Sequence, residues 1–315
     1  MIWQIFRSLT LIVLGLGFSA TVFAESANQP IKIVTTIKPL ALVIKDIGAD
    51  RIEVHQLIPD RSSPHDFAMR VSDRVKLDDA DLVVHIGEGF DGFIEKMVPD
   101  DRQLVTAGLD GLIWPEGEGC DDPSHHHDDE HDSEGHHHHH HHDHGKDLHL
   151  WLNPENINVL VTALAARLSE LDPEHAEQYL QRANSFSGQM QDYEQRTRAR
   201  FAKLPMDQFV VQHDAYGHFV EHFGLKQLGS LRNLSGAQVG AKSLAELLAH
   251  EKGKLACILV DPQFNSKPAE AFAQRTGVAT VMLDPLGSEI APGENGYLRF
   301  LENVADAFER CLNRK

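Results

Sequence analysis

Short apolar runs alternate with longer amphipathic segments along most of this chain of 315 residues. The runs 31–36, 52–58 and 81–86 are rich in β-branched residues and are bounded by turn residues, which predicts short strands. The segments 39–47 and 72–80 between them have the spacing of apolar residues that is typical of helices. Strands that alternate with helices predict βαβ units and parallel sheets.

A stretch rich in Ala, Leu, Glu, Gln and Arg interrupts this alternation between residues 154 and 201. Pro173 divides it, so we predict two consecutive helices. The second, 174–204, would span roughly 45 Å at 1.5 Å per residue, which is long enough to join two lobes. Strand and helix patterns then alternate again in 209–211, 217–223, 255–260, 268–276, 280–283 and 295–312. We therefore expect an α/β fold of two lobes with parallel sheets, joined by a long helix.

The first 24 residues have the three-part layout of a secretory signal peptide. Arg7 precedes the apolar run 9–22, and Val22-Phe23-Ala24 ends in a small-residue cleavage site. The alternative is an uncleaved membrane anchor, but Ser and Thr residues interrupt the run. We expect cleavage after Ala24. No later apolar stretch reaches the ~20 residues that cross a bilayer, so no stable membrane insertion is expected after cleavage.

The formal net charge of −18 limits the partners that this chain can bind. Binding to nucleic acid depends on clustered Lys and Arg, which the composition does not favour, so we expect no nucleic-acid partner. An acidic protein instead suits a cationic ligand.

Three cysteines, Cys120, Cys257 and Cys311, would enter an oxidising compartment, where at most one intramolecular pair can form. Their number alone does not choose the pair. Cys257 and Cys311 lie in segments predicted to pack, whereas Cys120 precedes a polar tract, so we favour Cys257 with Cys311. This bond would close a loop of 55 residues and stabilise the fold by ~4 kcal/mol on the chain-entropy model.

Residues 116–147 form a tract of Gly, Asp, Glu and His that has no apolar residues able to build a core. We expect a disordered insertion. Imidazoles mixed with carboxylates are ligands that Zn²⁺ accepts, so the tract is predicted to collect metal; the alternatives are a purification tag and a solvated linker. Its twelve histidines are His125, His126, His127, His131, His136, His137, His138, His139, His140, His141, His142 and His144.

A precise metal site must lie elsewhere, because a flexible tract offers many interchangeable geometries. His65, His149 and His213 each stand where a predicted strand or loop meets a turn. Ligands of open α/β sheets bind at such strand ends. Taken alone, each of these residues is more often an ordinary polar side chain than a ligand.

Several motifs occur in an order that resembles the ZnuA-type periplasmic zinc-binding proteins, which belong to the metal-specific solute-binding proteins of ABC importers. The match runs over nearly all of the chain after the signal peptide. The motifs are Thr-Thr-Ile-Lys-Pro-Leu at 35–40, Ser-Pro-His-Asp-Phe at 63–67, Ala-Asp-Leu-Val-Val at 80–84, His-Leu-Trp-Leu-Asn-Pro at 149–154, His-Asp-Ala-Tyr-Gly at 213–217, Asp-Pro-Gln-Phe at 261–264 and Leu-Asp-Pro-Leu-Gly at 283–287.

The resemblance implies two (β/α)₄ lobes, a rigid linking helix and a metal ion in the cleft between the lobes. It implies His65 and His149 as ligands from the first lobe and His213 from the second, with Asp284 or water in the fourth position. Three imidazoles and one oxygen suit tetrahedral Zn²⁺. Manganese-carrying relatives typically have Glu in the third position, so His213 favours zinc. Some relatives also place a metal-contacting Glu just before the first ligand, where this chain has Pro64.

The same resemblance implies a lobe at 25–172 that carries the insertion 116–147, a linking helix at 173–204 and a second lobe at 205–315. It places the protein in the periplasm, as a monomer that delivers Zn²⁺ to the membrane permease of a zinc ABC importer. It also supports the disulfide between Cys257 and Cys311. Because ligand imidazoles must be neutral, zinc binding is expected to weaken as the pH falls through about 6.5.

Two other functions compete with import. His218-Phe-Val-Glu-His222 matches the H-x-x-E-H pattern of a zinc metallopeptidase, with Glu221 as the general base and Glu302 as a nominal third ligand. A five-residue pattern arises easily by chance in a chain with 21 histidines, and we expect no enzyme. A periplasmic zinc buffer without an importer is the second alternative.

Overall fold

The chain forms two parallel sheets of four strands each, one in each half of the sequence. The computed structural model describes residues 29–115, 146–205, 208–250 and 255–313. In the first lobe the strands lie in the order β2-β1-β3-β4, and α1 and α2 flank them. The bounds are β1 Ile31–Thr35, α1 Lys38–Gly48, β2 Ile52–Gln56, α2 Val71–Asp79, β3 Leu82–His85 and β4 Gln103–Val105.

The second lobe repeats this strand order as β6-β5-β7-β8. The central pairing aligns Val210 with Ile258, and the register shifts once where β5 meets β6. The bounds are β5 Gln208–Val211, α5 Gly217–Phe223, β6 Lys226–Ser230, α6 Ala241–His250, β7 Cys257–Val260, α7 Lys267–Thr276, β8 Ala279–Met282 and α8 Gly296–Leu312. Because all strands in a lobe are parallel, their carboxyl ends meet at one edge.

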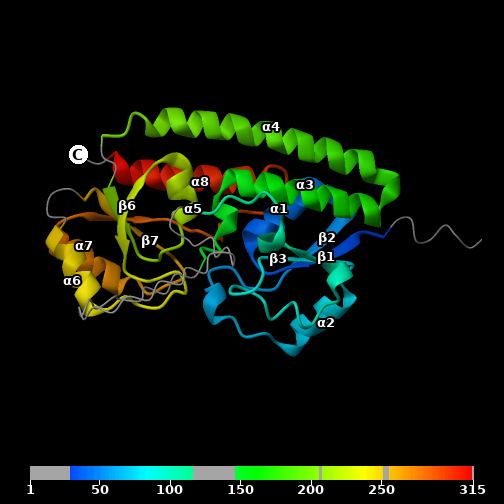
Figure 1. Ribbon diagram of the computed structural model, residues 1–315, viewed down its shortest axis with the longest axis horizontal. Helices are drawn as coiled ribbons and strands as arrows, with labels where there is room; N and C mark the ends of the chain where they lie inside the picture. The colour runs from blue at the N-terminus through cyan, green and yellow to red at the C-terminus, as the bar shows by residue number, and fades with distance from the viewer. Residues whose placement is uncertain (1–28, 116–145, 206–207, 251–254, 314–315) are drawn as a thin grey trace, which may run out of the picture.

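Two helices, α3 Pro154–Leu171 and α4 Ala176–Phe201, connect the lobes. Asn153 begins α3 by accepting a hydrogen bond from the main chain of Glu155, and Pro173 separates α3 from α4. The 26 residues of α4 span about 39 Å at 1.5 Å per residue. Figure 1 shows α4 running over both lobes, with α3 and α8 beneath it.

The lobes share one apolar core. Helix α8 of the second lobe packs against α1 of the first, and Asp46 at the end of α1 accepts hydrogen bonds from the main-chain N–H groups of Gly296 and Tyr297 at 2.9 and 3.0 Å. The largest cluster of buried apolar side chains includes Ile44 from the first lobe and Phe308 from the second. This continuous packing holds the two sheet edges in a fixed relation to each other.

The predicted fold class is confirmed: the structure is α/β, with two parallel four-stranded sheets joined by a long helix. Three elements were not predicted from the sequence, namely β4, β6 and α6. The boundaries 25–172, 173–204 and 205–315 stay a prediction. Among the described residues, no helix combines the length and the apolar character that crossing a membrane requires. The predicted signal peptide at 1–24 and the tract from 116 to 145, with all twelve of its histidines, lie outside the described residues.

The disulfide between Cys257 and Cys311 is confirmed. It joins β7 to α8, the two Cα atoms are 5.5 Å apart, and both side chains are buried. The bond therefore fixes the terminal helix to the centre of the second sheet. Cys120 lies outside the described residues.

Candidate metal centre

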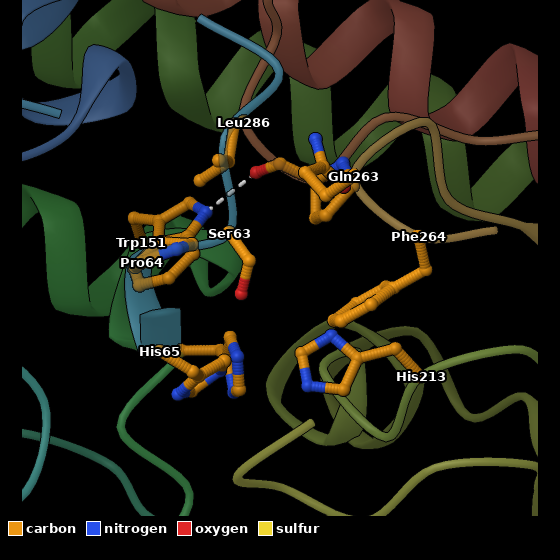
Figure 2. Close-up of a pocket in the computed structure, with 10 residues that line it drawn as sticks. Ser63, Pro64, His65, Trp151, His213, Gln263, Phe264 and Leu286 are labelled. Carbon is orange, nitrogen blue, oxygen red and sulfur yellow. Dashed lines mark hydrogen bonds between the residues drawn. The ribbon is translucent and has the colours of Figure 1, made fainter. Parts of the chain in front are cut away.

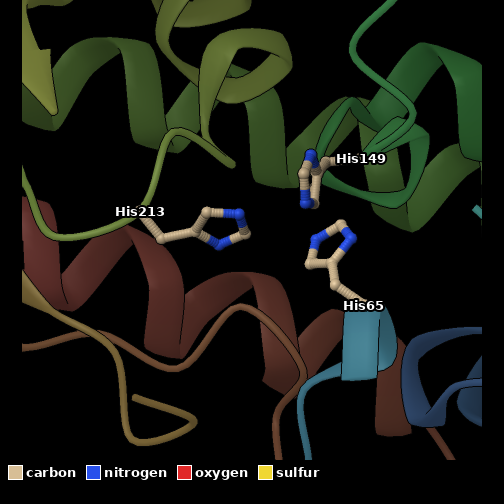
Figure 3. A group of neighbouring side chains, drawn as sticks. All are labelled: His65, His149 and His213. Carbon is tan, nitrogen blue, oxygen red and sulfur yellow. The ribbon is translucent and has the colours of Figure 1, made fainter. Parts of the chain in front are cut away.

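Three imidazoles from the two lobes meet in one place. His65 lies in the short 3-10 helix Pro64–Asp66, His149 directly precedes the 3-10 helix Leu150–Leu152, and His213 follows the carboxyl end of β5. One nitrogen of each ring lies within 4.8 Å of the others, and the ring centroids are 5.1 to 5.8 Å apart. Figure 3 shows His213 approaching from one side and His65 and His149 from the other. The structure thus brings together three of the four residues predicted as ligands.

His149 is oriented by a carboxylate two residues before it. The Nδ1 atom of His149 is 2.6 Å from Oδ1 of Asp147, and the same oxygen accepts the main-chain N–H of His149 at 3.0 Å. Burial alone would raise the pKa of Asp147, but its contacts with His149 outweigh burial and hold the pKa below its usual value. An ionised acceptor at Nδ1 leaves Nε2 of His149 with its lone pair directed at the other rings.

His213 has a similar support from the neighbouring strand. Asp261 directly follows β7, which pairs with β5, so both side chains lie at the carboxyl edge of the second sheet. Nδ1 of His213 is 3.4 Å from Oδ2 of Asp261, whose other oxygen accepts the hydroxyl proton of Tyr216. On its opposite side, Nε2 of His213 contacts the main-chain carbonyl of Leu234 at 3.2 Å. A metal ion would have to replace that carbonyl as the partner of Nε2.

His65 enters the centre as a neutral ring without a support of this kind. Its Nε2 is buried and has no hydrogen-bond partner among the described residues. Burial, with the nearby rings of His149 and His213, lowers the pKa of His65 to about 3. Folding therefore keeps the His65 ring neutral well below pH 6.5, because a buried imidazolium loses its solvation. A buried lone pair without a donor is the arrangement that a cation would satisfy.

The space between the rings is small and walled by apolar side chains. It measures about 10 Å³, which admits one water-sized particle. Figure 2 shows Pro64, Trp151 and Leu286 on one side of it and Phe264 on the other. Trp151 is held in place across the lobes, since its Nε1–H donates to the carbonyl of Pro285 at 2.7 Å. Such a site has room for a single ion.

A turn between β6 and α6 closes another side of the centre. Gly236 is buried with a φ of +78°, and a Cβ atom added there would lie 3.2 Å from Phe264 and 3.4 Å from His65. Arg232 holds this turn by donating to the carbonyl of Gly236 at 2.6 Å while its guanidinium lies over the Phe264 ring. The turn therefore packs against one ligand and one wall of the site.

Asp284 is not part of the cluster of ligand atoms. Its Oδ1 accepts hydrogen bonds from Gln263 at 2.7 Å and from the main chain of Leu286 at 2.9 Å, and its Oδ2 accepts from the main chain of Ser288 at 2.7 Å. In this position Asp284 shapes the turn that carries the apolar wall. Its role as a ligand stays a prediction, and coordination would require some of these hydrogen bonds to break.

The H-x-x-E-H pattern does not assemble a peptidase site. His218 is buried and contacts the main-chain carbonyl of Asp147, whereas His222 lies 3.6 Å from Glu155 and 3.5 Å from Glu194. Glu302, the nominal distal ligand, forms ion pairs with arginines of α4. The group of Glu155, Glu194 and His222 has the residue types of a metal site. Nε2 of His222, however, already contacts an N–H donor of Arg198 at 3.1 Å.

Asp147 and Asp261 were not identified from the sequence as part of the site. Asp261 is the first residue of the Asp-Pro-Gln-Phe motif, and Asp147 lies two residues before His149, the first residue of another motif. A carboxylate close to a ligand histidine is a usual partner of its second nitrogen. That rule would have pointed to Asp147, whereas Asp261 meets His213 only through the folding of the sheet.

The structure has two parallel α/β lobes fixed by a long helix, with the imidazoles of His65, His149 and His213 meeting between them. This arrangement defines the class of solute-binding proteins that hold a metal ion in their cleft. The family model described as "ZnuA: Zinc-uptake complex component A periplasmic" matches residues 33–311. The chain therefore belongs to the ZnuA family.

Similar proteins span nearly the whole chain. The High-affinity zinc uptake system protein ZnuA of Haemophilus ducreyi is 33% identical over 292 residues, which are 90% of this chain and 93% of that protein. The ZnuA protein of Yersinia pestis is 31% identical over 291 residues, with 89% and 91% coverage. Among solved structures, a zinc-bound ZnuA deletion mutant has a TM-score of 0.73 at 22% identity and covers 91% of this chain and 100% of its own. A Zn(II)-bound variant of AdcAII from Streptococcus pneumoniae has a TM-score of 0.74 at 26% identity, with 90% and 99% coverage.

Proposed function

We propose that this protein binds one Zn²⁺ ion through His65, His149 and His213 and delivers it to the membrane permease of an ABC importer. The observation that carries the proposal is the meeting of three imidazoles from two lobes, two of them buried, in a space for a single ion. Zinc accepts three imidazole nitrogens and one further ligand in tetrahedral geometry. Membership of a zinc-uptake family supplies the link to transport.

We propose water for the fourth ligand in the geometry described. Asp284, the residue predicted for that position, is engaged by three donors and lies outside the cluster. A shift of the turn 284–288 that frees one carboxylate oxygen is the alternative. Diffraction from the zinc-loaded protein separates the two, because it shows whether water or a carboxylate oxygen of Asp284 lies within bonding distance of the ion.

The tract at 116–147 is proposed as an auxiliary collector that raises the zinc concentration next to the centre. The last of its residues, Asp147, is also the support of His149. Pro115, which precedes the tract, and Asp147 both lie against Gly217 at the start of α5. Short residence in the tract, followed by transfer to a site with fixed geometry, is consistent with capture before import.

The family is periplasmic, and we propose that this chain reaches the periplasm by cleavage of the signal peptide at 1–24. We further propose that it works there as a monomer that docks on the permease and does not bind nucleic acid. The net charge of −18 supports the last point.

The test is a zinc titration of the full mature chain in competition with a chromophoric chelator that removes zinc from weak sites. We expect one tight site in the wild type that His65→Ala and His213→Ala each abolish. His222→Ala is the matched control, because this histidine lies on α5 but faces Glu155 and Glu194. Tight binding that survives in the first two variants contradicts the proposed ligands.

The two competing functions predict different outcomes of simple experiments. A zinc buffer that relies on the tract loses nearly all binding on deletion of 116–145, a deletion that spares Asp147, whereas the proposed site survives. Zinc-dependent peptide cleavage that is lost in Glu221→Gln would establish a peptidase and contradict transport as the main function.

A further inference from the structure

His218 is a fully buried polar residue that the zinc-binding proposal leaves without a role. It lies in the first turn of α5 and is 1% exposed. Its Nε2 is 2.8 Å from the main-chain carbonyl oxygen of Asp147, and its Nδ1 is 3.4 Å from Nδ2 of Asn156. The contact with Asp147 joins the second lobe to the loop of the first lobe that carries His149.

The chemistry of these partners fixes the tautomer of His218. A carbonyl oxygen can only accept, so Nε2 must carry the proton and donate it to Asp147. Burial lowers the pKa of His218, which keeps the ring neutral and leaves a lone pair on Nδ1 for the amide of Asn156. Asn156 is itself fixed, because its side chain exchanges two hydrogen bonds with the main chain of Ile113 at 2.7 and 2.9 Å. The ring therefore has a single orientation.

The residue that His218 holds is the residue that orients a zinc ligand. Asp147 receives the His218 proton on its main-chain carbonyl and presents its carboxylate to Nδ1 of His149 at 2.6 Å. The fit is tight, since a Cβ atom at Gly217 would lie 2.8 Å from Oδ2 of Asp147. His213 lies four residues before Gly217, the first residue of the same helix. The start of α5 thus determines the positions of ligands from both lobes.

We propose that His218 is a positioning residue of the metal centre, which holds Asp147 in the place where its carboxylate orients His149 relative to His213. The inference rests on the proposed zinc site and adds to it a residue that never touches the ion. Partners of this kind around a metal ligand typically change metal affinity by about 10- to 100-fold when they are removed.

The simpler account is that His218 only packs in the core beside Trp114, whose ring centroid is 5.9 Å away. The two accounts differ in a double-mutant cycle. If His218 acts through the carboxylate of Asp147, its replacement has no effect on zinc affinity once that carboxylate is gone. If His218 only packs, the losses of affinity in the two single variants add.

The experiment measures the zinc Kd of the full mature chain by chelator competition in the wild type, His218→Phe, Asp147→Ala and the double variant. We expect His218→Phe to raise Kd by about 10- to 100-fold in the wild-type background. In the Asp147→Ala background we expect a change of about twofold or less, the margin within which independent effects add. His222→Phe, one helical turn further along α5, is the control and leaves Kd unchanged.

A second pair of variants serves if His218→Phe does not fold, as judged by urea unfolding of the metal-free protein. His218→Gln keeps an N–H donor and is expected to retain the wild-type Kd, whereas the flexible apolar side chain of His218→Met fills the space without a donor and raises Kd. Three outcomes would overturn the role of His218. They are an equal rise in Kd on His218→Phe in the wild-type and Asp147→Ala backgrounds, an unchanged Kd in His218→Phe, and equal Kd values for His218→Gln and His218→Met. Failure of the wild type to bind zinc tightly overturns the proposed function instead.

Discussion

Acid is expected to destabilise the metal-free protein through His65. The ring takes up a proton near pH 6.5 in the unfolded chain, whereas burial and the neighbouring rings of His149 and His213 lower its pKa to about 3 in the folded chain. Because the pKa is depressed by folding, the stabilising contribution is present above about pH 6.5 and is lost as the pH falls towards 3.

The magnitude follows from the size of this shift. A difference of 6.5 to about 3 corresponds to about 5 kcal/mol in the free energy of unfolding, at about 1.4 kcal/mol per pH unit. About 3 kcal/mol of it is lost between about pH 7.5 and 4.5. This is a large part of the stability of a typical domain, so the effect is measurable.

The assay is urea unfolding of the metal-free wild type and of His65→Gln at about pH 7.5, 5.5 and 4.5. The amide of Gln does not titrate, so the free energy of unfolding of the variant is expected to fall less steeply below about pH 6.5, by about 3 kcal/mol at pH 4.5. Groups that do not interact with His65 titrate equally in both proteins and cancel in the difference. Parallel pH dependences would show that His65 is not held as a neutral buried ring.

Two further predictions concern single structural features. Gly236 and Gly277 share a φ of +78°, but only a side chain at Gly236 would contact His65. Gly236→Ala is therefore expected to raise the zinc Kd roughly tenfold in chelator competition, whereas Gly277→Ala leaves it unchanged. Equal effects of the two substitutions on Kd would contradict this prediction. Replacing Cys257 and Cys311 by Ala is expected to lower the free energy of unfolding, measured in urea, by about 4 kcal/mol, because the disulfide closes a loop with a sequence separation of 54. An unchanged midpoint of urea unfolding would contradict this prediction.

The elements that sequence patterns predicted are those with strong local signals. Strand β7 is a continuous apolar run, and β1 is apolar or β-branched at every position except Lys32. Pro154 and Pro173 mark the starts of the two connecting segments. In contrast, β4 has only three residues, and β6 has the sequence Lys-Gln-Leu-Gly-Ser, which is polar and contains Gly. Their strand conformation comes from pairing with β3 and β5, which is a tertiary effect.

The sequence predicted those parts of the site whose residues belong to recognisable motifs. His65, His149 and His213 were found through motifs in a family order, and the structure places all three together. What surrounds them depends on contacts between distant segments. The carbonyl of Leu234 and the close approach of Gly236 involve main-chain atoms, which no residue pattern reports.

The H-x-x-E-H match shows why a local pattern needs its structural context. Spacing alone suggested that His218 and His222 share a metal ion, but in the fold the first donates to a main-chain carbonyl and the second faces two carboxylates of other helices. Asp284 illustrates the converse case. Its motif suggests a ligand, whereas its three hydrogen-bond donors use both of its oxygens within a turn.

The central claim, one zinc ion held between the lobes by three imidazoles, is tested most directly by anomalous diffraction at the zinc absorption edge from crystals of the zinc-loaded protein. We predict one strong anomalous peak at about 2.0–2.1 Å from a ring nitrogen of each of His65, His149 and His213. A peak at Glu155, Glu194 and His222 instead, or zinc bound without any of the three predicted ligands, would contradict the account.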